Sequence, residues 1–122
     1  MDDGVSGAAI FRACYVELPT ISGDGRTVTA QLIFPDDFAA FAGHFPEDPI
    51  LPGFLQVELA LDMLRRLKMA AELKGVGRTR FFLPIRPGWR VYASLVAQAS
   101  VGFHLELKVD GEVATVMEIA VG

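Results

Sequence analysis

Residues 43–58 read GHFPEDPILPGFLQVE. Three prolines spaced three residues apart make the first part of this segment a stiff, extended loop with few free backbone dihedrals. A Pro-Gly pair follows and leads into an apolar helix on which Glu58 has almost no polar neighbours. The loop therefore holds His44 on a rigid support, and the start of the helix offers free backbone N–H groups to an anionic oxygen.

Together these groups are suited to removing a proton next to a carbonyl. His44 titrates near neutrality and can serve as the base, although a lone histidine can also be structural. Apolar surroundings push Glu58 towards the protonated form that a general acid needs, unless it pairs with an arginine from a later strand. The N–H groups of Gly53 and Phe54 can hold the oxygen on which charge develops, unless these residues form only a turn before the helix.

A second carboxyl group, that of Asp62, lies one helical turn after Glu58. Two carboxyl groups this close should not both ionise in an apolar site. We expect Glu58 to keep the proton because Asp62 lies nearer to the wetter half of the helix. Asp62 is therefore predicted to modulate the acid by keeping Glu58 protonated.

The 122 residues are enough for one domain with its own core, and we assign residues 1–122 to a single domain. Hydrophobic residues make up 52% of the chain, yet no apolar run reaches the roughly 18–20 residues of a membrane span. We therefore expect the apolar surplus to be buried in a core and an oligomer interface. Asp2 and Asp3 stand where a signal peptide carries positive charge, so we expect a cytoplasmic location. Cys14 is the one cysteine, which excludes an internal disulfide and a cysteine-based metal site.

Basic residues are concentrated in one segment of a chain whose net charge is −4. Eight of the eleven lie within residues 65–90, opposed there by Glu72 alone: Arg65, Arg66, Lys68, Lys74, Arg78, Arg80, Arg86 and Arg90. Such a patch indicates an acidic partner or a phosphate-bearing ligand, the alternative being a solvated helix end and strand edges. The segment lacks aromatic residues interleaved at nucleic-acid spacing, so we expect no nucleic-acid partner.

Hydrophobic periodicity predicts six strands and two helices. The strands are expected over residues 8–18, 27–34, 78–83, 91–99, 102–109 and 113–121. A short helix is expected over 38–41, and a long helix over 54–73 that ends at Gly75 and Gly77. Asp110-Gly111 predicts a tight hairpin. One long apolar helix and a run of antiparallel strands give an α+β fold, in which a curved sheet wraps the helix in the hotdog arrangement. An edge strand of such a sheet can pair with a second copy.

The motif His44-Phe45-Pro46, Pro49-Ile50, Pro52-Gly53 and Glu58 resembles the active-site motif of the 3-hydroxyacyl-[acyl-carrier-protein] dehydratases, the FabZ/FabA-like family. In that family the acidic residue also stands fourteen positions after the histidine. Residues 80–88 resemble the family's strand-turn-strand after the central helix, and residues 108–114 its closing hairpin.

The resemblance implies a hotdog fold, a homodimer or higher oligomer, and dehydration of a 3-hydroxyacyl thioester to the trans-2-enoyl product. It implies His44 as the base, Glu58 of a second protomer as the acid, and Gly53 as the donor to the thioester oxygen, without a metal or redox cofactor. The acyl chain would lie in a tunnel beside residues such as Phe54, Leu55 and Phe81. The substrate would arrive on the phosphopantetheine of an acyl carrier protein docked on Arg65, Arg66, Lys68, Arg78, Arg80, Arg86 and Arg90.

Two departures from the family pattern point to a specialised relative. Glu47 stands where glycine is usual, and Asp62 replaces a glutamine usual four residues after the acid. We read these as signs of a lipid, polyene or polyketide-type pathway. Two alternatives are a hotdog thioesterase, which needs a carboxylate and a water, and a non-catalytic hotdog subunit that pairs with an active partner.

Overall fold

The computed structural model of the chain describes residues 10–38, 49–98 and 102–122. Within them one six-stranded sheet runs in the order β1-β2-β4-β5-β6-β3, and every neighbouring pair is antiparallel. The strands are β1 (Tyr15–Ile21), β2 (Thr27–Ile33), β3 (Leu73–Phe81), β4 (Arg90–Ala97), β5 (Gly102–Val109) and β6 (Glu112–Val121). β1 and β3 form the two edges of this sheet.

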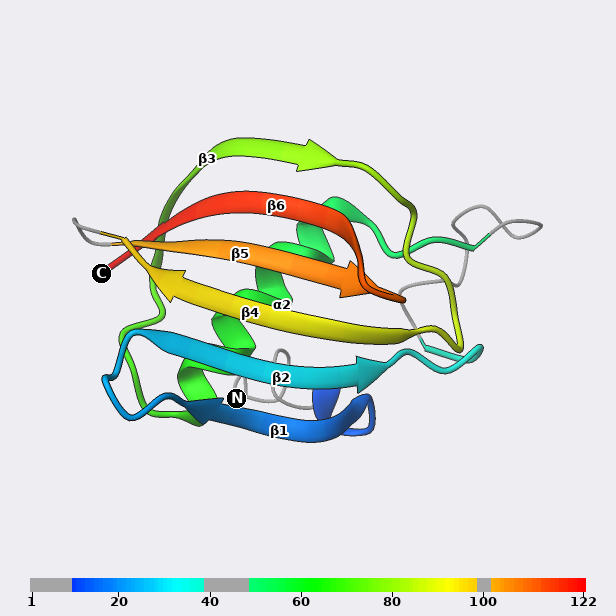
Figure 1. The fold of residues 1–122 in the computed structure, drawn as a ribbon, viewed down its shortest axis with the longest axis horizontal. Helices are drawn as coiled ribbons and strands as arrows, with labels where there is room; N and C mark the ends of the chain where they lie inside the picture. The colour runs from blue at the N-terminus through cyan, green and yellow to red at the C-terminus, as the bar shows by residue number, and fades with distance from the viewer. Residues whose placement is uncertain (1–9, 39–48, 99–101) are drawn as a thin grey trace, which may run out of the picture.

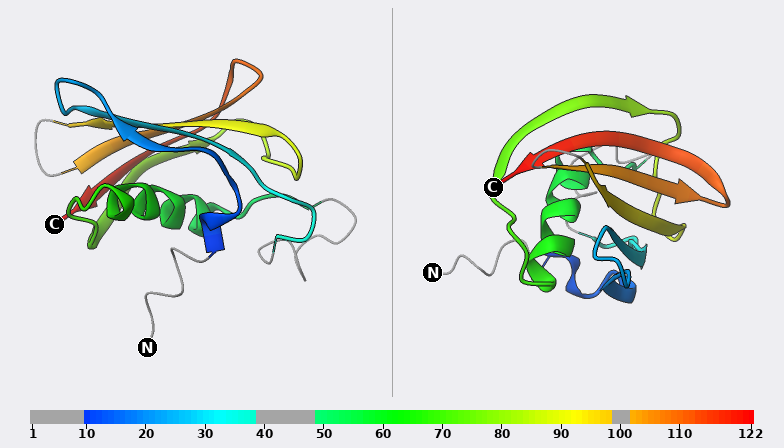
Figure 2. Two further views of the ribbon diagram at one scale, coloured as in Figure 1. Left: turned by 90° about the horizontal axis from the view of Figure 1, so that it is seen from below. Right: turned by 60° about the vertical axis from the view of Figure 1, so that its left-hand side comes forward.

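Helix α2 (Gly53–Arg66) lies against one face of the sheet, and the strands curve over it (Figures 1 and 2). Alternate residues of the central strands point at the helix, as in β5, where Leu105 and Leu107 are fully buried. From the helix, Leu59, Met63 and Leu64 are equally buried. The core therefore lies between the sheet and this helix, which confirms the predicted α+β hotdog arrangement.

The first predicted strand is wrong in its first half. Residues 10–12 form a helical turn, Cys14 N–H donates to the Phe11 carbonyl at 2.9 Å, and β1 begins only at Tyr15. Phe11 and Cys14 are buried, and the Phe11 ring packs on the rings of Phe34 and Phe38. A short apolar run does not distinguish a buried turn from a strand, which explains the error.

The helix is also shorter than predicted, because it ends seven residues before the expected Leu73. Lys68 adopts a left-handed conformation with φ of 59°. The N–H of Lys68 donates to Arg65 O at 2.9 Å, and that of Met69 donates to Leu64 O at 3.0 Å, which is the bonding pattern of a Schellman cap. The expected terminators Gly75 and Gly77 lie inside β3, which therefore starts five residues before the predicted Arg78.

The closing hairpin is as predicted. Asp110 and Gly111 have φ of 53° and 77°, as the two central residues of a type I′ turn require, and they join β5 to β6. The short helix predicted over residues 38–41 falls almost entirely outside the described residues. Of the residues that are described, none belongs to a helix long and apolar enough to cross a membrane.

Candidate functional site

The start of α2 provides two backbone donors for which no described residue supplies an acceptor. Pro52 is the N-cap residue and has no side chain that could accept a hydrogen bond, and no acidic residue occurs in the first turn. The N–H groups of Leu55 and Gln56 both donate to Pro52 O, at 3.1 and 3.3 Å. In the described part of the chain, no acceptor meets the N–H of Gly53 or Phe54. This helix end can therefore bind an oxygen that carries negative charge.

Gly53 lies against the ring of Phe81, the last residue of β3. A Cβ atom at position 53 would come within 2.9 Å of Phe81 Cζ, closer than carbon atoms pack. The absence of a side chain thus lets the start of the helix approach the end of an edge strand. The predicted role of its N–H towards a ligand stays a prediction.

A cavity of about 450 Å³ opens at this meeting point. Its walls are mostly apolar and come from two segments, Ile50–Gly53 with Gln56 and Phe81–Pro84. Phe81 and Phe82 are 58% and 53% exposed, so they lie at the mouth of the cavity. Phe54, predicted to contact substrate, does not line this cavity, and its ring is 63% exposed.

Glu58 is half-buried on α2, and none of the described residues forms an ion pair or a hydrogen bond with its carboxyl group. The alternative in which Glu58 pairs with an arginine of a later strand is therefore absent from this part of the chain. His44 lies outside the described residues, as does Glu47. The roles of His44 as the base and Glu58 as the acid therefore stay predictions.

Asp62 differs from the expectation. It is fully buried, whereas Glu58 is only half-buried, so the prediction that Asp62 is the wetter of the two carboxyl groups is wrong. The reason is a pair of hydrogen-bond partners: Arg66, one helical turn after Asp62, and Tyr15 of β1, which spacing along the helix does not reveal. Tyr15 Oη donates to Asp62 Oδ2 at 2.7 Å, and Arg66 Nε donates to the same oxygen at 2.7 Å.

The three side chains Tyr15, Asp62 and Arg66 form a compact cluster, called the clasp below, that ties β1 to α2. The guanidinium carbon of Arg66 lies 4.8 Å from the centre of the Tyr15 ring. Burial raises the pKa of Tyr15 well above its ordinary value, and the hydrogen bond to Asp62 raises this pKa further. The phenol therefore remains a hydrogen-bond donor throughout the neutral range.

The predicted docking residues fall into two groups in the structure. Arg65 and Lys68 are exposed at the end of α2, and Arg78 and Arg80 are exposed on the edge strand β3. The other three are engaged with neighbours: Arg66 in the clasp, Arg86 over the Trp89 ring at 5.9 Å, and Arg90 through Nη1 to Gln31 Oε1 at 3.0 Å.

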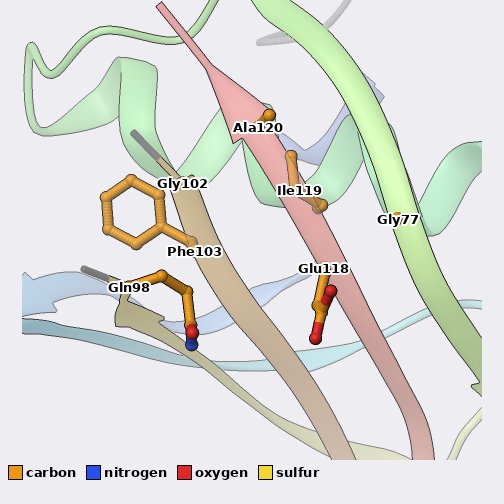
Figure 3. A pocket seen from close by; sticks show the side chains of 7 residues that line it. All are labelled: Gly77, Gln98, Gly102, Phe103, Glu118, Ile119 and Ala120. Atoms are coloured by element: carbon orange, nitrogen blue, oxygen red, sulfur yellow. The ribbon is translucent and has the colours of Figure 1, made fainter. Parts of the chain in front are cut away.

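A second hollow, of about 260 Å³, lies at the end of the sheet where β5 begins (Figure 3). It is lined by Gly77, Gln98, Gly102, Phe103, Glu118, Ile119 and Ala120, and it contains none of the predicted site residues. Across residues 10–38, 49–98 and 102–122, no cluster of three histidine, cysteine, aspartate or glutamate side chains is placed to hold a metal ion.

Several solved structures share this fold. The chain superimposes on a chain of the dehydratase heterocomplex ApeI:P from Xenorhabdus doucetiae with a TM-score of 0.72 and 18% identity, over 86% of this chain and 96% of that one. It superimposes on the E. coli PaaI protein of the phenylacetic acid degradation operon with a TM-score of 0.61 and 12% identity, over 95% and 88%. At these identities the matches establish the hotdog fold alone.

Sequence comparison defines the family. The chain is 35% identical over 114 residues to the 3-hydroxyacyl-[acyl-carrier-protein] dehydratase FabZ of Agrobacterium fabrum, and 32% identical over 114 residues to FabZ of Allorhizobium ampelinum. Each alignment covers 84% of this chain and 72% of the relative. The family described as ApeI-like, ApeI dehydratase, matches residues 20–117. The chain therefore belongs to the ApeI-like family of hotdog dehydratases.

Proposed function

We propose that the chain dehydrates 3-hydroxyacyl thioesters, carried on the phosphopantetheine of an acyl carrier protein, to trans-2-enoyl thioesters. The observation that carries this proposal is the uncapped start of α2 at Gly53, which opens on an apolar cavity of about 450 Å³. A volume of this size suits a thioester with part of its acyl chain or arm. The similarity to FabZ enzymes supports the same reaction.

The reaction is an elimination of water, which leaves the overall oxidation level of the substrate unchanged. His44 takes the proton from C2, and the electron pair of that C–H bond forms the C2–C3 double bond. The C3–O bond breaks as Glu58, supplied by a second protomer, donates a proton to the leaving oxygen. Meanwhile the N–H of Gly53 holds the thioester oxygen as it gains enolate character. The chemistry needs no redox cofactor, and a cytoplasmic biosynthetic pathway would suit it.

The proposed second protomer fits the exposed edge of β3. Among the described residues this strand has no neighbour on one side, and it exposes Leu73, Val76 and Phe81 by 41%, 47% and 58%. Pairing with β3 of a second copy would cover these side chains and extend the sheet. Sedimentation velocity at micromolar concentration tests this assembly, which a purely monomeric chain would contradict. The neighbour in Xenorhabdus is a heterocomplex, so the same experiment should be repeated with a co-expressed hotdog partner.

The carrier protein is expected to dock through the exposed basic residues beside the cavity and at the end of α2. Reversing the charge at Arg78 and Arg80 should raise KM for a carrier-bound substrate and leave a short thioester without the carrier nearly unaffected. The effect should weaken with added salt, because exposed charges are screened over about 8–10 Å at physiological ionic strength. Equal losses on both substrates would assign these residues to the fold instead.

The decisive experiment follows enoyl absorbance with 3-hydroxyacyl carrier proteins of several chain lengths. We expect His44→Ala and Glu58→Gln each to lower kcat by about 10²–10⁴ with the fold intact. Mixing the two variants should restore part of the activity if the active site is shared between protomers. Wild-type turnover by either variant contradicts the assignment, and release of free thiol without enoyl product would select a thioesterase.

A further inference from the structure

Three buried polar atoms of the described residues have no hydrogen-bond partner: Gln56 Oε1, Asp62 Oδ1 and Thr115 Oγ1. Asp62 already accepts two short hydrogen bonds on its other oxygen, and Thr115 lines none of the cavities described above. Gln56 differs because it also lines the cavity at the start of α2. A buried acceptor without a partner is costly to the folded state. An acceptor left open beside a cavity indicates a donor that comes with a ligand.

The one hydrogen bond of Gln56 identifies which of its two terminal atoms is free. Gln56 Nε2 donates to the Leu51 carbonyl at 3.2 Å, and that carbonyl can only accept. The nitrogen must therefore face Leu51, which leaves Oε1 as the free atom and makes it an acceptor. Gln56 is 97% buried on an otherwise apolar side of α2, since its residual exposure is 3%.

The position of Gln56 relates this acceptor to the proposed reaction. It stands three residues after Gly53, so both residues lie on the same side of the first helical turn and line the same cavity. The other lining residues, Ile50, Leu51, Pro52 and residues 81–84, are apolar or proline. The Gly53 N–H and the Gln56 carboxamide thus give the cavity one donor for an oxygen and one acceptor for a polar hydrogen.

We propose that Gln56 is a specificity-determining residue that accepts a hydrogen bond from the amide N–H of the phosphopantetheine arm nearest to the sulfur. This inference rests on the proposed function. The terminal torsion of glutamine is soft, so a small rotation brings Oε1 from under the cavity wall to its surface. With the thioester oxygen on Gly53, the arm lies towards the mouth formed by Phe81 and Phe82.

The amide is preferred over the other donor of the substrate, the 3-hydroxyl group. That hydroxyl leaves as water and must be protonated, so the group that meets it is an acid and not a neutral acceptor. The arm carries its amide N–H into an apolar mouth, where an unpaired donor would be costly to bury. A hydrogen bond from this amide N–H to Gln56 Oε1 gives both groups a partner.

The test uses two 3-hydroxyacyl thioesters that differ by one group. One is the N-acetylcysteamine thioester, which carries the amide, and the other is its analogue with CH₂ in place of N–H. For the wild-type chain we expect kcat/KM on the amide substrate to be higher than on its CH₂ analogue by on the order of tenfold. In Gln56→Met, which has a similar length and no acceptor oxygen, this ratio should fall to about one, through loss on the amide substrate alone.

Because the ratio is measured within each protein, a general loss of stability or activity in Gln56→Met cancels. Equal rates on the two thioesters in the wild type overturn the inference without any variant. So does a tenfold ratio that persists in Gln56→Met. If neither thioester is dehydrated, the proposed function fails, and calorimetry with the corresponding unreactive thioethers then decides about Gln56. Tighter binding of the N–H thioether supports its role, whereas equal binding or no binding of the pair refutes it.

Discussion

Breaking the clasp of Tyr15, Asp62 and Arg66 should destabilise the protein in a way that the geometry predicts. In Tyr15→Phe the phenol oxygen that donates to Asp62 at 2.7 Å is removed and the ring remains. A hydrogen bond to a charged group contributes about 1.5–3 kcal/mol. The Asp62 carboxylate keeps Arg66 as a partner in this variant. We therefore expect Tyr15→Phe to lower the free energy of unfolding by about 2 kcal/mol.

Asp62→Asn should cost more because it removes the charge that neutralises Arg66. Breaking a fully buried ion pair costs about 3–5 kcal/mol. The Asp62 side chain is 1% exposed, but that of Arg66 is 24% exposed and can reach water, so we expect the lower end, about 3 kcal/mol. Since both changes act on one cluster, the double variant should cost about 1–2 kcal/mol less than the sum of the two.

Urea denaturation followed by circular dichroism measures these values. With a slope of about 1–3 kcal/mol per molar urea, a loss of 2 kcal/mol moves the midpoint by about 1 M. Tyr92→Phe is the matched control, because Tyr92 is 44% exposed on β4 and lies away from the clasp. A midpoint in Tyr15→Phe that is the same as in Tyr92→Phe, or strict additivity in the double variant, would refute the reasoning.

Three further predictions concern single positions. Gly53→Ala should change stability little, since the exposed Phe81 ring can rotate away from the new Cβ. The KM for the thioester substrate should nevertheless rise because the cavity becomes narrower. Adding Phe81→Ala to Gly53→Ala should reverse that rise in KM. Lys68→Gly should raise the urea midpoint by relieving left-handed strain of about 1 kcal/mol, whereas Lys68→Ala, which keeps the strain, should not. Burial raises the pKa of Cys14 to about 11, from an ordinary value of 9.0. Between these two pH values the unfolded chain ionises first, so the free energy of unfolding should fall, by at most about 1.4 kcal/mol per pH unit, relative to Cys14→Ala measured in the same buffers.

The sequence predicts those parts of the fold that local patterns encode. The strict alternation of β5 gives its bounds, Gly102–Val109, and Asp110-Gly111 gives the turn that follows, because both signals lie within a few residues. The helix end is missed because a lysine, and not a glycine, takes the left-handed position of the cap. Cap positions are identified from sequence by the residues that adopt them at low cost, and Lys68 is not one of these.

The candidate site likewise contains residues that the sequence identifies and one that it does not. Gly53 and Glu58 follow from a contiguous motif, and Gly53 is the first residue of α2, after an N-cap residue without a side-chain hydrogen bond. Gln56 lies inside that motif and is missed because, on sequence alone, a glutamine near a helix start is unremarkable. The signal that the sequence does not show is burial. Gln56 is only 3% exposed in an apolar wall, where each of its polar atoms needs a hydrogen-bond partner, whereas on the surface water would supply one.

The clasp also changes the argument for how the two carboxyl groups of α2 share their roles. Tyr15 and Asp62 lie 47 residues apart, so helical spacing alone pairs Asp62 with Glu58 and misses the phenol. With Tyr15 and Arg66 on its Oδ2 atom, Asp62 is already committed to hydrogen bonds that link β1 to the helix, and the positive charge of Arg66 offsets its own. Its influence on Glu58 is therefore reduced, and Glu58, without a partner among the described residues, remains the carboxyl group that we propose as the acid. Asp62→Asn should accordingly lower the free energy of unfolding by about 3 kcal/mol and leave the alkaline limb of the pH–rate profile nearly unchanged. A large downward shift of that limb with stability preserved would instead restore Asp62 as the group that keeps Glu58 protonated.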